Sequence, residues 1–482
     1  MRWTVQEIAR ALHAPVPSGV DPLARVAGVS IDSRTVASGQ LFVAIQGPRH
    51  DGHQFVDAAL HAGAPAAIVA APHLADYPVA VRGKLIAVPD TLAALQDLAS
   101  AVRRAWGRRI AAVTGSVGKT TTKEILAALL GAKFRILKSE GNLNNEYGLP
   151  LALLRLEPEH EAAVVELGMS HRGELKRLAE IAEPEVGVVT QVAPVHLEFF
   201  SSVGEIALAK RELIEGLAGP DTVAVLNADD VRVARFAEVA RGRALTFGFS
   251  PSAQFRAENV IDRGAEGTAF DFISPQGRLA LELPLPGRHS IANALAALAA
   301  ASVWGIGAAE ASAVLPHLAA GEMRGRLLRF DSGIAVINDS YNSNPVALRA
   351  MTELLARTPG FQRRILAAGE MLELGPESPR LHRDAGRHAA SQHLDYIIAV
   401  QGEASELAKG AVEGGLPSEH VHFFASASEA AAFLLEFLRP GDLLLVKGSR
   451  GVKMERIVEG LRARYRPAGD GKEVPARAPG HS

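Results

Sequence analysis

Cysteine is absent from the 482 residues of this chain. This absence excludes disulfide bonds and thiol catalysis, and it fits a reducing compartment. No apolar run approaches the roughly 20 residues that a helix needs to cross a bilayer. Residues 1–17 also lack the uninterrupted apolar segment of a signal peptide. We therefore expect a cytoplasmic protein with no membrane span.

Net charge and aromatic residues are scarce as well. The formal net charge is −2, so no overall field attracts the chain to nucleic acid or to a membrane surface. Only 5% of the residues are aromatic, which leaves few rings to stack on bases and disfavours a nucleic-acid-driven NTPase. Hydrophobic residues, at 48%, are ample for a core. We expect a monomer with no nucleic-acid partner.

The order of apolar runs predicts an α/β fold in three domains. The length of the chain also suits three domains, at about 100–200 residues per domain. Residues 1–106 predict a small α/β domain, and a run of arginines at 103–109 predicts a linker. Residues 107–320 alternate strands and helices as a mostly parallel sheet requires. Within this range, residues 254–285 change to short runs that predict hairpins. Residues 321–465 predict a second, doubly wound sheet. The tail, 466–482, is rich in Pro, Gly and charge and is predicted to be disordered.

The strand candidates are short apolar runs bounded by polar or turn residues. They are residues 41–45, 66–69, 85–88, 110–113, 162–165, 186–190, 223–226, 245–249, 335–337, 364–367, 396–400, 421–423 and 443–446.

One glycine-rich stretch in the central domain predicts a phosphate-binding turn between a strand and a helix. Glycines let backbone N–H groups converge on oxyanions, and a helix N-terminus adds a favourable field. Lys119 supplies a cation for the outer phosphates, and the Thr120 hydroxyl can hold Mg²⁺. The glycine spacing is shorter than in the general P-loop, and a plain turn beside a solvated lysine is the alternative. The predicted ATP-binding residues are Gly115, Ser116, Val117, Gly118, Lys119, Thr120 and Thr121.

Glu166 is a candidate for a metal site, whereas His196 and Lys210 in the same domain are ambiguous on the residues alone. Glu166 ends an apolar run, where a carboxylate completes the Mg²⁺ site of P-loop proteins; the alternative is an acidic residue that merely ends a strand. His196 follows a predicted strand, but a lone histidine is more often structural. To react, Lys210 must lose a proton from a pKa near 10.4, which costs about 4–5 kcal/mol at pH 7. From the residues alone, a solvated helix lysine is the simpler interpretation.

Two polar loops follow predicted strands of the last domain. Residues 338–345 combine hydroxyls, amides, an aromatic ring and a carboxylate, which is typical of contacts to a nucleotide base and ribose. The same residues also suit a helix start, with Ser or Asn as the N-cap and Pro345 in the first turn, and the two roles are compatible. Residues 447–450 offer two cations and a hydroxyl to an anionic ligand.

Together these motifs resemble those of the Mur ligases, from about residue 28 to residue 460. The shortened glycine-rich stretch at 114–121 is similar to that of the family. Other similar stretches are residues 32–34, 39–44, 51–53, 141–146, 166–169, 196–198, 209–210 and 226–230. In the last domain, residues 339–345, 369–375 and 446–450 resemble the branch that adds D-alanyl-D-alanine, and the Asp-Asn-Pro-Arg signature of the diaminopimelate-adding branch is absent.

The resemblance implies an N-terminal UDP-binding domain, a central P-loop ATPase domain and a C-terminal Rossmann-like domain. It implies a ligase that uses ATP and Mg²⁺ to join D-alanyl-D-alanine to UDP-N-acetylmuramoyl-tripeptide, through an acyl phosphate, in peptidoglycan precursor synthesis. Another Mur-type ligase, adding diaminopimelate or lysine, or a folylpolyglutamate-synthase-like ligase is the nearest alternative. A non-catalytic, ATP-gated binding protein is the alternative from a different class.

The resemblance also assigns catalytic roles. It implies that Lys210 is carbamylated, that this carbamate and His196 hold a second Mg²⁺, and that Glu166 serves the metal sites. It implies that Lys119 and Arg326 act on the phosphates, with Arg326 reaching the γ-phosphate.

Binding roles follow in the same way. Beyond the glycine-rich stretch, the resemblance implies ATP contacts for Asn293, Arg326, Asp339 and Asn342. It implies substrate contacts for Ser33, Arg34, Asn142, Asn145, Tyr341, Lys447 and Ser449. Departures from the family pattern at Gln191, Ser290 and Asn338 are modest polar changes, and we expect them to affect substrate affinity more than reaction type.

Overall fold

The computed structural model describes residues 3–47, 50–195 and 197–468. His196 and the greater part of the predicted tail, 469–482, lie outside the described residues. Within the described residues, no helix combines the length and the apolar character that a bilayer crossing requires.

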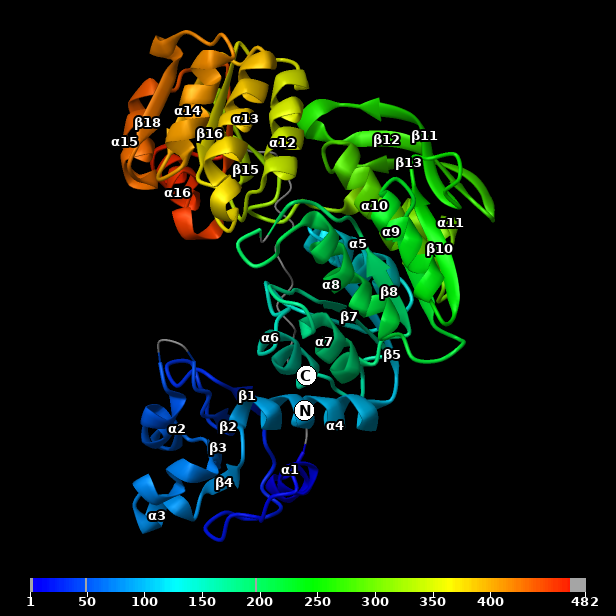
Figure 1. The fold of residues 1–482 in the computed structure, drawn as a ribbon, viewed down its shortest axis with the longest axis vertical. Helices are drawn as coiled ribbons and strands as arrows, with labels where there is room; N and C mark the ends of the chain where they lie inside the picture. The colour runs from blue at the N-terminus through cyan, green and yellow to red at the C-terminus, as the bar shows by residue number, and fades with distance from the viewer. Residues whose placement is uncertain (1–2, 48–49, 196, 469–482) are drawn as a thin grey trace. The chain divides into compact units, whose positions relative to one another are not determined.

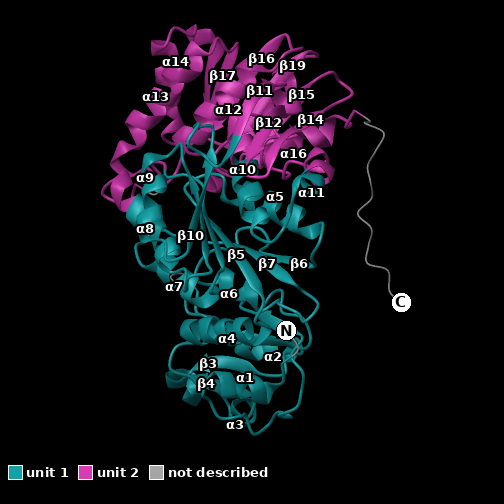
Figure 2. Cartoon of the chain, turned by 90° about the vertical axis from the view of Figure 1, so that its right-hand side faces the viewer, with its two compact units in different colours: residues 1–192, 207–256, 293–311 teal, residues 193–206, 257–292, 312–482 magenta. Residues whose placement is uncertain are grey.

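The chain forms two compact units, which Figure 2 distinguishes by colour. Unit 1 comprises Met1–Val192, Ala207–Arg256 and Asn293–Ala311, and unit 2 comprises Ala193–Ile206, Ala257–Ala292 and Ser312–Ser482. The described strands form three sheets, one from each predicted domain, which confirms the α/β fold class. The domain borders near residues 106, 320 and 465 stay predictions.

The first sheet belongs to unit 1 and has four parallel strands in the order β1-β2-β3-β4 (Figure 1). Its strands are β1 (Gly28–Ser30), β2 (Gln40–Val43), β3 (Ala67–Ala70) and β4 (Leu85–Val88). The accompanying helices are α1 (Val5–Ala11), α2 (Val56–His61), α3 (Val79–Arg82) and α4 (Thr91–Trp106).

The second sheet carries six neighbouring parallel strands in unit 1, in the order β10-β9-β8-β5-β7-β6. They are β5 (Arg109–Thr114), β6 (Ile136–Lys138), β7 (Ala162–Glu166), β8 (Val186–Val189), β9 (Val223–Asn227) and β10 (Arg243–Gly248). The helices are α5 (Lys119–Gly131), α6 (Gly148–Leu153), α7 (Glu174–Ala182), α8 (Val203–Glu215), α9 (Val231–Ala234), α10 (Arg288–Ser302) and α11 (Ala308–Val314). Strands β7, β8 and β9 are buried throughout, as parallel strands covered on both faces should be.

The strand order determines which loops meet. Because β5 lies between β8 and β7, the loop after β5 starts between the ends of those two strands. The carboxyl ends of parallel strands share one edge of the sheet, and ligands of open α/β sheets bind at that edge. The predicted hairpin also forms, since β12 (Thr268–Ser274) pairs antiparallel with β13 (Gly277–Leu283) after β11 (Phe255–Asp262).

The third sheet lies in unit 2, in the order β14-β15-β19-β16-β17-β18, and only β14 is antiparallel to its neighbour. Its strands are β14 (Arg326–Arg329), β15 (Ala335–Asp339), β16 (Arg363–Gly369), β17 (Tyr396–Val400), β18 (Val421–Phe424) and β19 (Asp442–Lys447). The helices are α12 (Pro345–Arg357), α13 (Ser378–Ser391), α14 (Ala404–Glu413), α15 (Ala427–Phe437) and α16 (Glu455–Arg464).

Alternate residues of these strands enter two separate cores. Leu443 and Leu445 pack with helices α12 to α14, whereas Leu444 and Val446 pack with α15 and α16. This period of two places helices on both faces, which confirms the predicted doubly wound sheet.

The linker expected at the arginine run is reduced to two residues. Arg103 lies in the last turn of α4, and β5 already begins at Arg109. Arg103 is buried, and its guanidinium donates to the carbonyl oxygens of Ala182 (2.7 Å) and Glu183 (3.0 Å) at the end of α7. A cation is favourable at the C-terminus of a helix, so this arginine holds α4 against α7.

We therefore expect Arg103→Ala to lower the free energy of unfolding by about 2–3 kcal/mol, because the carbonyl groups of Ala182 and Glu183 lose a charged donor. Chemical denaturation followed by circular dichroism measures the change. Arg104→Ala is the matched control: Arg104 is 66% exposed and pairs with Glu183, and its loss should cost at most about 1 kcal/mol. Equal losses in the two variants would contradict the role of Arg103.

Candidate functional site

The turn between β5 and α5 has a backbone that only glycine suits. Gly115 and Gly118 have φ angles of 149° and 86°. A Cβ on Gly115 would lie 1.9 Å from Oγ1 of Thr190, and one on Gly118 would lie 2.2 Å from Oδ1 of Asn293. Gly118 is also the N-cap of α5, so no side chain competes with an anion for the first turn of the helix.

The rest of the turn is held by the two residues that follow β8 and by its own lysine. The Ser116 N–H donates to the Gln191 carbonyl (2.7 Å), and the Thr190 hydroxyl donates to the Val117 carbonyl (2.5 Å). The ammonium of Lys119 donates to the Gly115 carbonyl at 2.8 Å, so the side chain points back over the turn. The predicted phosphate-binding stretch is therefore an ordered loop with a cation above it.

Glu166 lies at the end of β7, beside the first turn of α5. Its Oε2 accepts a hydrogen bond from the Thr120 hydroxyl (2.7 Å), and its Oε1 accepts one from Nδ2 of Asn144 (2.8 Å). The side chain is buried, with 3% exposed. Hydroxyl and carboxylate oxygens are hard ligands of the kind that Mg²⁺ prefers, so Thr120 and Glu166 fit that ion.

Lys210 lies on α8 and is almost completely buried. Burial lowers the pKa of its amine well below the usual value, and the positive charge of Lys119 lowers it further. The structure thus contradicts a solvated helix lysine, which was the simpler interpretation of the residues. A buried lysine with a strongly lowered pKa is available as a neutral nucleophile.

Asn293 also belongs to this group of residues. Its Oδ1 accepts a hydrogen bond from the Thr122 hydroxyl at 3.4 Å and lies beside Gly118. It therefore borders the turn, as an ATP contact should, although that role stays a prediction.

The predicted substrate contacts of the first sheet and the β6–α6 loop are partly engaged by the protein itself. Arg34 is 85% exposed and donates three hydrogen bonds to Asp32, two from the guanidinium at 2.9 and 2.6 Å and one from the main-chain N–H at 3.0 Å. These bonds lower the pKa of Asp32 to about 2. Ser33 lies half-buried between them, and Asn142 is exposed. Asn145 accepts from the Gly148 N–H (2.9 Å) and so helps to start α6.

The Asp51-Gly52-His53 stretch is a structural turn. His53 is buried, and its Nε2 accepts from the Ala70 N–H at 2.9 Å. The proton must then be on Nδ1, which donates to Asp51 at 2.6 Å. Although His73 stacks on His53, neither ring nitrogen of His53 is available to a metal ion.

In unit 2, the structure brings together four predicted residues at the carboxyl ends of β15 and β19. Lys447 is buried, and its ammonium lies 2.6 Å from Oδ2 of Asp339 and 2.9 Å from the Asn342 carbonyl. Ser449 is also buried: its hydroxyl accepts from the Leu372 N–H (2.9 Å) and donates to the Ser343 carbonyl (3.4 Å). These contacts fix the loop that follows β15.

The other predicted residues of unit 2 border this loop. The Tyr341 ring lies under the guanidinium of Arg324, at 4.1 Å. Arg326 is exposed on β14, where its Cα pairs with that of Asn338. Asn344 caps α12 by accepting from the Ala347 N–H (2.9 Å), which confirms the predicted helix start with Pro345 in the first turn.

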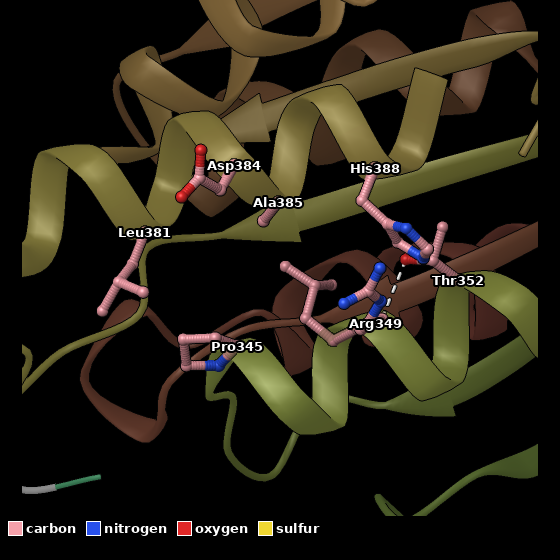
Figure 3. Close-up of a pocket in the computed structure, with 8 residues that line it drawn as sticks. Pro345, Arg349, Thr352, Leu381, Asp384, Ala385 and His388 are labelled. Carbon is pink, nitrogen blue, oxygen red and sulfur yellow. Dashed lines mark hydrogen bonds between the residues drawn. The ribbon is translucent and has the colours of Figure 1, made fainter. Parts of the chain in front are cut away.

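A cavity of about 320 Å³ lies elsewhere in unit 2, between α12 and α13 (Figure 3). Arg349 and His388 approach each other across it, and burial lowers the pKa of His388. Of the predicted polar loop 338–345, Pro345 alone lines this cavity, and the described residues predicted to bind ATP, substrate or metal do not line it. Its lining consists of Pro345, Leu348, Arg349, Thr352, Leu381, Asp384, Ala385 and His388.

Sequence reasoning missed three residues that hold the site in unit 1. Asn144 contacts the Glu166 carboxylate, the Ser139 hydroxyl accepts from the Glu166 N–H at 3.0 Å, and Thr190 supports the glycine turn. Thr190 follows β8 at the sheet edge next to β5, so its position could have identified it. Asn144 lies between Asn142 and Asn145, and nothing in the sequence distinguishes the three amides.

Three domains of the Mur ligase family match separate stretches that together cover most of the chain. The catalytic domain of the Mur ligase family matches residues 25–103, the Mur ligase middle domain matches residues 113–301, and the glutamate ligase domain of Mur ligases matches residues 323–450.

Individual proteins are similar over most of their length. The UDP-N-acetylmuramoyl-tripeptide–D-alanyl-D-alanine ligase of Escherichia coli K12 is 37% identical over 441 residues, 90% of this chain and 93% of that protein. The crystal structure of MurF from Acinetobacter baumannii has a TM-score of 0.85 and 30% identity, covering 96% of this chain and 99% of that one. The structure of a MurF ligase from Thermotoga maritima in complex with ADP has a TM-score of 0.77 and 29% identity, covering 91% and 98%.

The lowered pKa of Lys210 makes stability depend on pH. Between the folded pKa and the unfolded value near 10.5, the unfolded chain carries the extra proton, so stability rises with pH across this interval. Lys210→Met removes the titration. We expect this variant to exceed the unaltered protein in free energy of unfolding at pH 7, and by less at pH 9.5, in bicarbonate-free buffer. A difference that does not change with pH would contradict the burial of a titrating amine.

Proposed function

Because the chain belongs to the Mur ligase family, we propose that it joins D-alanyl-D-alanine to UDP-N-acetylmuramoyl-tripeptide at the expense of ATP, in peptidoglycan precursor synthesis. The names of the similar proteins support this substrate pair, and the ADP complex of the Thermotoga maritima ligase supports the nucleotide. ATP and UDP-linked sugars are cytoplasmic compounds, so we place the reaction in the cytoplasm. The observation that carries the proposal is the glycine turn with Lys119 above it and Glu166 hydrogen-bonded to Thr120.

The chemistry requires activation of a carboxylate. A carboxylate oxygen of the tripeptide attacks the γ-phosphorus of ATP, and ADP leaves as the acyl phosphate forms. The amine of D-alanyl-D-alanine then attacks the acyl carbon, the amide bond forms, and inorganic phosphate leaves with the activated oxygen. The attacking nitrogen loses its proton in this second step.

The chain's own residues contribute mainly position and charge, as in other phosphoryl transfers. The N–H groups of the turn and the start of α5 would bind phosphate oxygens. Lys119 would neutralise charge on the outer phosphates, because its ammonium lies over the turn, where it now donates to the Gly115 and Ser116 carbonyls. Asn293 borders the same turn and would orient the nucleotide.

Mg²⁺ would be held by the Thr120 hydroxyl and the Glu166 carboxylate, with Asn144 orienting that carboxylate. When bound, the ion neutralises phosphate charge. For a second ion, we propose a carbamate on Lys210, together with His196. Burial lowers the pKa of the Lys210 amine and so favours its neutral form, which is the form that reacts with CO₂.

Release of ADP in the presence of different amines tests the activity. With UDP-N-acetylmuramoyl-tripeptide and Mg-ATP, we expect release to require D-alanyl-D-alanine. Stimulation by diaminopimelate, lysine or glutamate instead would identify a different amide ligase. Release that no amine stimulates would favour an ATP-gated binding protein and would contradict the proposal.

Lys119→Ala should abolish ligation, because the outer phosphates lose their cation, while the free energy of unfolding stays within about 1 kcal/mol of the unaltered value. Product formation by mass spectrometry and chemical denaturation measure the two quantities. Near-normal turnover in a folded variant would overturn the role of Lys119.

A further inference from the structure

Lys123 is a fully buried lysine that the proposed reaction does not use. It lies on α5, one helical turn after Lys119, and its side chain is 0% exposed. Burying an ammonium is costly unless it is paired and hydrogen-bonded. We therefore ask which groups inside the protein its ammonium contacts and what those contacts hold in place.

The ammonium of Lys123 is directed to the strand at the edge of the sheet. Nζ donates to the Ser139 carbonyl at 2.6 Å and lies 3.0 Å from Oε1 of Glu124. Glu124 pairs with Lys138 as well. Ser139 is the residue that follows β6, and it too is buried, with 1% exposed.

Ser139 in turn fixes the end of β7. Its N–H donates to the Val164 carbonyl (3.0 Å), and its hydroxyl accepts from the Glu166 N–H (3.0 Å). Glu166 is the residue whose carboxylate receives the hydrogen bonds of Thr120 and Asn144. A continuous series of contacts thus joins Lys123 to the main chain of Glu166 through a single serine.

We propose that Lys123 is a positioning residue for the Mg²⁺ site. Its ammonium immobilises Ser139, and Ser139 immobilises the main chain of Glu166, so that the carboxylate stays within reach of the Thr120 hydroxyl. The inference rests on the proposed function, in which Glu166 serves the metal ion. Groups that orient a metal ligand without touching the metal typically change metal affinity by about 10–100-fold when they are removed.

The test measures ADP binding by calorimetry at a series of Mg²⁺ concentrations, and it does not require turnover. Lys123→Met keeps the aliphatic part of the side chain but has no ammonium, and Ser139→Ala removes only the hydroxyl. We expect each variant to raise the Mg²⁺ concentration for half-maximal ADP binding by about tenfold. ADP binding without Mg²⁺ should be unchanged.

Two further comparisons separate positioning from packing. The double variant should be no worse than either single variant, because both act through the same contacts. Lys123→Arg should restore most of the Mg²⁺ response, since it keeps a buried cation. Lys133→Met is the matched control: Lys133 follows α5, is 41% exposed and pairs with Glu310, and the Mg²⁺ response should be unchanged.

An unchanged Mg²⁺ midpoint in folded Lys123→Met overturns the inference. Should Lys123→Met fail to fold, an unchanged midpoint in Ser139→Ala overturns it equally. Glu166→Gln separates this inference from the proposed function. If it abolishes the Mg²⁺ response while Lys123→Met and Ser139→Ala leave the response intact, only the inference fails. If the Mg²⁺ response of the unaltered protein survives in Glu166→Gln, the metal role of Glu166 fails, and the inference fails with it.

Discussion

At Gly115 and Gly118 the main chain follows a path that a side chain would obstruct, and the candidate site depends on this path. A Cβ at Gly115 would meet the Thr190 hydroxyl, which itself holds the turn through the Val117 carbonyl. One at Gly118 would meet Asn293. The two glycines therefore allow β8 and α10 to approach the turn closely. That close approach places the start of α5 at the edge of the sheet where ligands of α/β folds bind.

The carboxylate of Glu166 depends on the same arrangement from the other side of β5. Strand β7 places it beside the first turn of α5. On the β6 side, the Ser139 hydroxyl holds the main-chain N–H of Glu166, and Asn144 donates to the carboxylate. The two strands that flank β5 therefore supply different parts of the site. The β8 side supports the glycine turn, and the β7 side supplies oxygen ligands suited to a hard cation.

Much of the fold could be predicted because the buried parallel strands are apolar throughout. The strands that the pattern missed are β1, β6 and β14, which are three or four residues long and lie at the edges of their sheets. Their residues are mostly half-buried or exposed, so they give no continuous apolar signal. The arginine run was misread as a linker because burial of Arg103 depends on α7, some 80 residues away.

The glycine-rich stretch could be predicted because its function depends on residues adjacent in sequence. Contacts such as Thr120 with Glu166, 46 residues apart, depend on strand order, which local patterns do not contain. At Gln191, where the sequence departs from the family pattern, the main-chain carbonyl accepts the Ser116 N–H, and this contact does not depend on the side chain. Burial likewise determines the chemical character of Lys210, and its neighbours in the sequence do not indicate that it is buried.

The central claim is that the phosphate-binding turn serves to activate a carboxylate. The fate of the oxygen atoms of that carboxylate shows whether it does. The terminal carboxylate of UDP-N-acetylmuramoyl-tripeptide can be labelled with ¹⁸O and incubated with D-alanyl-D-alanine and Mg-ATP, and the products weighed by mass spectrometry. Activation as an acyl phosphate predicts one labelled oxygen in each phosphate released and one in the new amide. Ligation that releases unlabelled phosphate would contradict the account.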